Sequence, residues 1–139
     1  MRIAALALIS QLAFSAPPPD AATDVWDVVA TMAAALAEPN DAAFMQPISK
    51  SFPQHGLIER HVRALVQVND VVSSISLVAN EGGDQRRTIE VDWYMEIQPR
   101  VPGGLLSRRR ENVKLILTKT GKRWMITSLS PVEFFAVPN

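Results

Sequence analysis

The chain has 139 residues, no cysteine and a formal net charge of zero. This length fits one domain, and the lack of cysteine excludes disulfides, thiolate metal sites and cysteine nucleophiles. A neutral protein is also poorly suited to binding nucleic acid through its phosphates. The charge is nevertheless split: residues 1–85 hold four basic and nine acidic residues, and residues 86–139 hold ten and five.

The N-terminus predicts a secretory signal. One positive charge precedes a mostly apolar run over 3–14, and small residues follow, which is the layout of a signal peptide. The run is shorter than the ~20 residues that a membrane-spanning helix needs. We expect a signal peptide over 1–15, a proline-rich spacer over 16–23 and an exported protein, periplasmic or extracellular, without a transmembrane anchor. A buried N-terminal helix is the less favoured alternative, because the run ends in three prolines.

Residues 24–137 predict a single domain that begins with helices. The first helix is expected over 24–38, capped by Thr23 or Asp24 and ended by Pro39. Its apolar residues recur at three- and four-residue steps: Val25, Val28, Val29, Met32 and Leu36.

Two more helices are expected before the pattern changes. Asn40 has the side chain of a helix N-cap and predicts a short second helix that contains Phe44. A third helix is expected over 53–67, with His61 on the margin of its buried side. That buried side is formed by Leu57, Ile58, Val62 and Leu65.

From Val71 onward the apolar period is two, which predicts strands. The expected strands cover 71–79, 87–97, 109–119 and 123–130. In the second strand the odd positions from Ile89 to Ile97 are apolar, so Asp92 and Tyr94 should point to the opposite face. Phe134 and Phe135 then close the edge of the core. Helices followed by strands predict an α+β fold, with N-terminal helices packed on the concave face of a curved antiparallel sheet of about four strands.

Two segments resemble a known family. Ala35-Leu36-Ala37-Glu38-Pro39-Asn40-Asp41-Ala42-Ala43-Phe44 looks like the first helix, acidic turn and second helix of the nuclear transport factor 2-like superfamily, and Lys122-Arg123-Trp124-Met125-Ile126 looks like the entry to its final strand. This superfamily has a cystatin-like cone and includes ketosteroid-isomerase-like and polyketide-cyclase-like proteins. The resemblance implies a pocket between sheet and helices, and often a dimer across the open sheet face. Its members include enzymes, ligand binders and interaction domains.

Large side chains on the expected inner face predict a ligand pocket. Plain core packing is the interpretation that we favour for these side chains, because large side chains supply most of the buried area in any core, although both can hold in a cone-shaped fold. The candidate lining residues are Trp26, Met32, Phe44, His61, Trp93, Met95 and Trp124.

Catalytic and metal sites have weak candidates. His61 could act as a general base, since the ordinary histidine pKa suits neutral pH, but we favour a helix-flank histidine. Asp92 and Tyr94 could pair for proton abstraction, but the alternation directs both away from the pocket. His55 and His61 do not share a helix face, so we expect no metal site, and no sequence motif calls for a cofactor.

A basic cluster could bind an acidic partner or anionic head groups. The alternative that we favour is cross-strand pairing of these arginines with Glu90, Glu96 and Glu111, together with edge protection by charge. The arginines are Arg86, Arg87, Arg100, Arg108, Arg109 and Arg110.

The sequence thus favours an exported, non-catalytic module that binds an apolar small molecule or a protein. An isomerase- or cyclase-type enzyme with His61 as its base is the alternative. A third hypothesis is an interaction domain that forms a homodimer through the outer sheet face bearing Asp92 and Tyr94.

Overall fold

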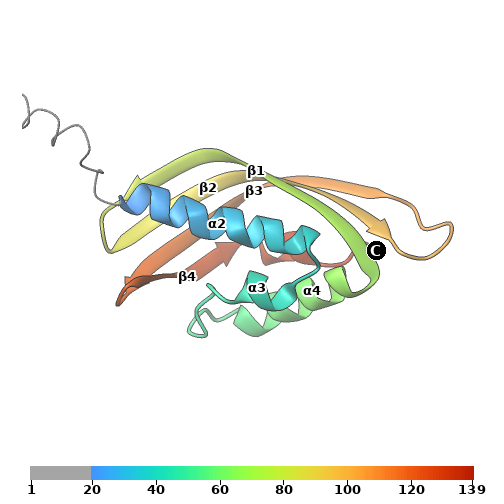
Figure 1. The fold of residues 1–139 in the computed structure, drawn as a ribbon, viewed down its shortest axis with the longest axis horizontal. Helices are drawn as coiled ribbons and strands as arrows, with labels where there is room; N and C mark the ends of the chain where they lie inside the picture. Colours follow the sequence, from blue (N-terminus) through green and yellow to red (C-terminus); the bar gives the residue numbers. More distant parts are fainter. Residues whose placement is uncertain (1–19) are drawn as a thin grey trace, which may run out of the picture.

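The computed structural model describes residues 20–139, in which three helices precede a four-stranded antiparallel sheet (Figure 1). The predicted signal peptide and residues 16–19 of the predicted spacer lie outside the described residues. The spacer was predicted too long, because residues 21–23 already belong to the first helix. The elements are α2 (Ala21–Ala37), α3 (Asp41–Met45), α4 (His55–Val68), β1 (Asn69–Gly82), β2 (Arg86–Pro99), β3 (Ser107–Thr120), β4 (Arg123–Ser130) and the short 3-10 helix η1 (Val132–Phe135). The predicted α+β order is confirmed.

Two helix starts differ from the prediction. Helix α2 begins three residues early, because the Asp20 carboxylate, and not Thr23 or Asp24, is the N-cap and accepts the Thr23 amide at 2.7 Å. Helix α4 begins at His55 and not at Pro53, because a turn joins the Phe52 amide to Ser49 and the His55 amide to Phe52. The short helix α3 is capped as predicted, since the Asn40 side chain accepts the Ala43 amide at 3.0 Å.

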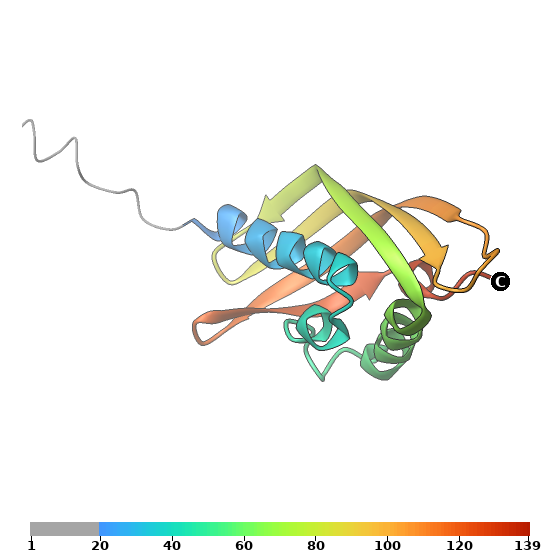
Figure 2. The same cartoon turned by 45° about the vertical axis from the view of Figure 1, so that its right-hand side comes forward.

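The sheet has the order β1-β2-β3-β4, and every neighbouring pair is antiparallel. Figure 2 shows the strands curving around the helices, which lie on the concave side. The strand bounds extend beyond those predicted for the first three strands and match them for β4. Residues 69–77 of β1 pair regularly with β2 until a bulge shifts the register between Leu77 and Ala79.

One edge of the sheet is covered by a further segment of the chain, and the other edge is open within residues 20–139. Beside β4, the chain between α3 and α4 forms a parallel bridge from Ile48 to Ile126. The Ser49 amide donates to Ile126, and the Ile126 amide donates to Pro47, each at 2.8 Å. Strand β1, at the other edge, pairs only with β2 among the described residues.

The alternation in β2 is confirmed, and it locates the core. Odd positions from Ile89 to Ile97 are fully buried, whereas Asp92 and Tyr94 are half-buried on the opposite face. The inner side chains of the sheet pack against Val25, Val29, Met32 and Leu36 of α2 and against Ile58, Val62 and Leu65 of α4. Phe134 and Phe135 of η1 are buried in the same cluster, as predicted.

Candidate functional site

The space between sheet and helices is filled by aromatic rings. Phe135 lies at the centre of this packing, with its ring centroid 5.0 Å from that of Trp93 and 5.3 Å from that of Phe44. Phe134 adds a further edge contact to Trp93 at 6.3 Å. These distances are typical of edge-to-face aromatic packing. The C-terminal helix η1 therefore supplies side chains at the place where a ligand pocket was predicted.

Four of the predicted pocket residues belong to this packing. Met32, Phe44, Trp93 and Met95 each have 0% of their surface exposed. A hollow wide enough for a water molecule would leave accessible surface on the side chains that line it. The structure therefore shows a closed core around these four residues, as expected for the close-packed interior of a protein.

The other two predicted tryptophans lie nearer the surface. Trp26 is half-buried on α2 and packs against the core. Trp124 is 7% exposed, its ring lies 6.0 Å from the Lys119 ammonium, and its indole N–H has no hydrogen-bond partner among the described residues. A ligand role for the predicted set stays a prediction.

Ser73 explains how a polar atom is accommodated beneath the sheet. Its hydroxyl on β1 accepts a hydrogen bond from the indole N–H of Trp93 at 2.9 Å. Leaving a buried donor unpaired costs about 1–3 kcal/mol. A serine that lies between Val71 and Ile75 on the inner side of β1 is therefore matched to a tryptophan on the adjacent strand.

Replacement of Ser73 by alanine is expected to lower the free energy of unfolding by about 1–3 kcal/mol, because the Trp93 N–H loses its acceptor. Urea denaturation measures the loss. Ser74→Ala is the matched control, since Ser74 is exposed on the next position of β1, and it should change stability by less than about 0.5 kcal/mol. Equal losses in the two variants would show that the hydrogen bond contributes nothing.

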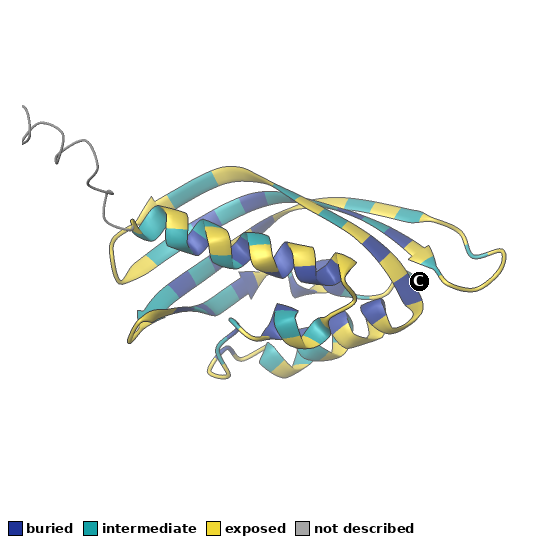
Figure 3. Cartoon of the chain, in the orientation of Figure 1, coloured by how far each residue is buried: buried dark blue, intermediate teal, exposed yellow. Residues whose placement is uncertain are grey.

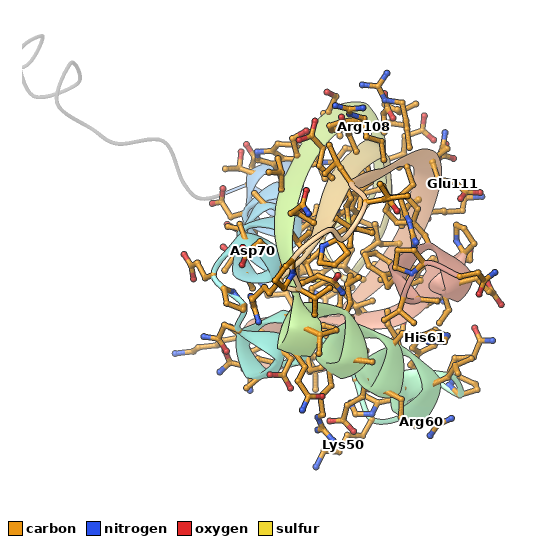
Figure 4. The ribbon with its side chains drawn as sticks, turned by 90° about the vertical axis from the view of Figure 1, so that its right-hand side faces the viewer. Lys50, Arg60, His61, Asp70, Arg108 and Glu111 are labelled. Atoms are coloured by element: carbon orange, nitrogen blue, oxygen red, sulfur yellow. The ribbon has the colours of Figure 1, made fainter. Side chains whose placement is uncertain are left out.

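His61 is half-buried on α4, and Figure 4 shows it on the side of this helix towards the rest of the domain, whereas Arg60 lies on the side away from it. It does not line any of the four surface hollows that residues 20–139 form most clearly. His61 takes part in no ion pair within residues 20–139, and its general-base role stays a prediction. No group of three or more metal-ligating side chains occurs within residues 20–139.

Asp92 and Tyr94 belong to a polar ladder on the outer face of the sheet. The Tyr94 hydroxyl donates to the Glu96 carboxylate at 2.6 Å, and the Arg110 guanidinium lies 5.2 Å from the Tyr94 ring centre. Ion pairs link the ladder to β3: Glu96 with Arg108 at 3.5 Å, Asp92 with Arg110 at 3.5 Å and Glu90 with Lys114 at 4.0 Å. Acidic residues of β2 thus pair with basic residues of β3, which is typical of a solvent-exposed sheet face.

One hydrogen bond shifts two pKa values in this ladder. Donation from Tyr94 lowers the pKa of the Glu96 carboxyl, and acceptance by Glu96 raises the pKa of the Tyr94 phenol. A carboxyl whose pKa is lower in the folded chain adds stability above its unfolded pKa. That stability is lost as the pH falls through the folded pKa. A phenol with a raised pKa adds stability below its unfolded pKa, which is lost as the pH rises through the folded value.

Tyr94→Phe is therefore expected to raise the pKa of Glu96 towards its ordinary value, and to weaken the acid dependence of stability. An NMR titration of the glutamate carboxyl carbons follows the first effect. Arg108→Met is the control, because Arg108 has a smaller influence on Glu96 than Tyr94 has. An unchanged Glu96 pKa in Tyr94→Phe would rule out the hydrogen bond as the cause.

The predicted basic cluster is largely structural. Arg87 donates to Asn80, Gly82 and Gly83 across the first hairpin. Arg109 donates to the carbonyls of Phe134 and Ala136, each at 2.7 Å, and burial lowers its pKa.

Arg100 closes the C-terminal end of α4. Its guanidinium donates to the carbonyls of Val66, Gln67 and Asn69 at 2.9–3.1 Å and to the Asp70 carboxylate at 2.9 Å. The last carbonyls of a helix lack partners within the helix, and a cation there also meets the negative end of the helix dipole. The predicted pairing with an arginine of the cluster is found for Glu96, which pairs with Arg108. It was wrong for Glu90, which pairs with Lys114, and Glu111 forms no ion pair among the described residues. Figure 4 shows Arg108 and Glu111 on β3 at the surface.

Two of the four surface hollows lie at the ends of helix α4. The larger, about 810 Å³, lies between α3, the start of α4 and β4, and His55, Glu59 and Lys50 line it with neighbouring side chains. The other, about 630 Å³, lies where the β2–β3 loop meets the C-terminal segment. Its lining includes Val68, Pro99, Leu105, Leu106, Val137 and Pro138, and we call these six residues the apolar end.

No family model matches the sequence, and no curated protein matches it. Solved structures do match: a conserved protein from Planctomyces limnophilus has a TM-score of 0.68 at 10% identity, over 76% of this chain and 89% of that chain. A nuclear transport factor 2-like superfamily protein from Salmonella enterica has a TM-score of 0.64 at 9% identity, over 77% and 86%. The chain has a nuclear transport factor 2-like fold. The association domain of CaMKII from C. elegans shares this fold with a TM-score of 0.55 at 16% identity, over 77% and 91%.

Within this nuclear transport factor 2-like fold, the apolar end is a feature that was not predicted from the sequence. Leu105 is 84% exposed, and Val68, Leu106 and Val137 are 56%, 40% and 42% exposed. The signal was present in the sequence, because two adjacent leucines follow Gly103-Gly104 in a loop whose composition is otherwise typical of a turn. The two leucines are 37 and 38 residues from Val68 in the sequence, and only the fold brings them together.

Proposed function

We propose that this chain is an exported, non-catalytic module that binds another protein. The observation that carries the proposal is the closed interior: Met32, Phe44 and Trp93 have no exposed surface beneath the sheet. A substrate or small ligand in the cone would have to displace these side chains. On the outer face, Asp92 is paired with Arg110 and Tyr94 with Glu96, so the predicted Asp92–Tyr94 pair is already engaged in other contacts.

The apolar end is the surface that we propose for binding. Soluble monomers rarely expose large contiguous apolar patches, and such patches commonly mark protein contacts. Leu105 and Leu106 project from the loop between two long strands, and they share a groove with Val68 and Val137. An apolar patch in a groove fits a partner that inserts apolar side chains.

The small-ligand alternative is tested with the intact protein. We expect a broad panel of lipophilic compounds to leave both the tryptophan fluorescence and the melting temperature unchanged. A compound that shifts the melting temperature and quenches Trp93 would contradict the closed interior and restore the pocket hypothesis. His61→Gln, assayed with any such compound, would then test the enzyme alternative.

Protein binding is tested by position-specific photocrosslinking in the producing cell. A photoreactive residue at Leu105 should give an adduct of discrete mass, whereas the same residue at exposed Lys122, in the β3–β4 turn, should give none. Adducts at both positions, or at neither, would reject the apolar end as the binding surface.

Export is part of the proposal because residues 1–15 have the pattern of a signal peptide. No described helix is long and apolar enough to cross a membrane. Mass spectrometry of the protein recovered outside the cytoplasm should give an N-terminus at or near Ala16. An intact N-terminus that stays in the cytoplasm would contradict export.

A further inference from the structure

Strand β1 forms an edge of the sheet that no other strand covers among the described residues. It is 14 residues long, and Figure 3 shows that it is exposed or half-buried along most of its length. Natural proteins usually protect such edges with charges or prolines, because unpaired backbone groups recruit further strands. Residues 71–80 of β1 contain no charged residue and no proline.

Apolar side chains accompany this uncharged edge. Val72, Leu77 and Val78 are 53%, 53% and 54% exposed. They lie on β1 itself, away from the apolar end. The edge strand therefore combines unpaired backbone groups with apolar surface, which are the two features that strand addition uses.

The register identifies the backbone groups that point away from β2. The Arg100 amide donates to the Val68 carbonyl, which makes Val68 and Arg100 a hydrogen-bonded pair. Antiparallel pairs alternate between hydrogen-bonded and non-hydrogen-bonded positions. Even-numbered residues of β1 therefore direct their backbone groups towards β2, and odd-numbered residues direct theirs away from it. The outward-directed N–H and C=O groups belong to Val71, Ser73, Ile75 and Leu77.

We propose that β1 pairs antiparallel with β1 of a second copy of this chain, about a two-fold axis at Ser74. This inference goes beyond the proposed function: it names a second copy of this chain as a further partner, and it assigns β1, not the apolar end, as the strand that receives it. The register places Val71 opposite Leu77 and Ser73 opposite Ile75 of the second copy. All four outward-directed residues on each edge then find partners.

The sequence of the edge suits a second copy in this register. Val72 lies opposite Ser76, and Ser74 lies opposite itself, so no like charges meet within the paired segment. Asp70 lies opposite Val78, and its charge is already balanced by Arg100 at 2.9 Å. The bulge between Leu77 and Ala79 ends the regular segment at the point where the pairing would also end.

Charged substitutions at Ser74 test whether the two-fold axis lies at this residue. The dimer is measured by light scattering over a series of protein concentrations. The native protein should form dimers, whereas Ser74→Lys and Ser74→Glu should each raise the dissociation constant by about tenfold or more, because like charges then face each other. Mixing the two variants should restore the dimer. Asn112→Lys, on the exposed outer face of β3, should leave the native dimer unchanged.

A cysteine at the axis gives an independent readout, because the chain has no other cysteine. Ser74→Cys should form a covalent dimer on mild oxidation, since non-hydrogen-bonded antiparallel pairs bring side chains close enough for a disulfide. Asn112→Cys should form no covalent dimer under the same conditions. Crosslinking at residue 112 but not at residue 74 would indicate the outer face and overturn the β1 proposal.

A native protein that is monomeric at all concentrations would also overturn it. A dimer whose dissociation constant is unchanged in both Ser74→Lys and Ser74→Glu would overturn the β1 proposal as well. Neither result affects the crosslinking at Leu105, so a failure of this inference is distinguishable from a failure of the proposed function.

Discussion

Trp93→Ala is expected to lower the free energy of unfolding by about 3–5 kcal/mol, the range for removing a large aromatic side chain from a core. Trp93 has no exposed surface, contacts Phe44, Phe134 and Phe135, and donates to Ser73. Alanine removes all these contacts together and leaves a cavity. Since whole domains are stable by about 5–15 kcal/mol, the loss should be visible as a large drop in the urea midpoint.

Two further measurements keep this prediction testable if the alanine variant folds poorly. Trp93→Phe retains a ring in the same place and should lose less stability than Trp93→Ala. Indole should raise the melting temperature of Trp93→Ala and not that of the native protein, because an apolar cavity of sufficient size binds small aromatic molecules. Stabilisation of the native protein by indole would show that its interior already contains a usable space.

Arg100→Met is expected to lower the free energy of unfolding by about 1.5–3 kcal/mol, the range for hydrogen bonds to a charged group. The guanidinium joins the end of α4 to the end of β2, through carbonyls that have no partner in the helix. Methionine keeps much of the aliphatic stem and removes all the donors. Amide hydrogen exchange should therefore accelerate in the last turn of α4 before it does so elsewhere.

Arg86→Met is the matched control, because Arg86 is exposed and its side chain forms no ion pair within the described residues. It should change stability by less than about 0.5 kcal/mol. Arg100→Lys should restore only part of the loss, because an ammonium cannot reproduce the planar fork of donors. Equal losses in Arg86→Met and Arg100→Met would mean that the bonds at the end of α4 are replaced by water without cost.

The fold could be predicted from the sequence where a single period dominates. In β2, strict alternation from Ile89 to Ile97 determines which face is buried, because a sheet covered on one side by helices has one dry face. The Asn40 cap was recognisable because it follows a proline that ends the preceding helix. The start of α2 was misplaced because Thr23 and Asp24 are also good caps, and alanines at 21 and 22 carry no apolar signal.

The candidate site depended on contacts that no local pattern contains. Arg100 meets the end of α4 about 30 positions earlier in the chain, so its role is invisible to spacing rules. Trp93 and Met32 were correctly expected on the inner face. Whether that face encloses a hollow depends on how far Phe134 and Phe135 reach into it, which is a matter of tertiary packing.

The chain between α3 and α4 has a consequence for assembly. By bonding both backbone groups of Ile126, it occupies the middle of the β4 edge. A sheet with two open edges can add copies at both ends and grow into a filament. Among the described residues, only the β1 edge of this sheet is open. Two copies that pair through β1 would therefore leave no open edge for a third copy, and assembly would stop at a dimer.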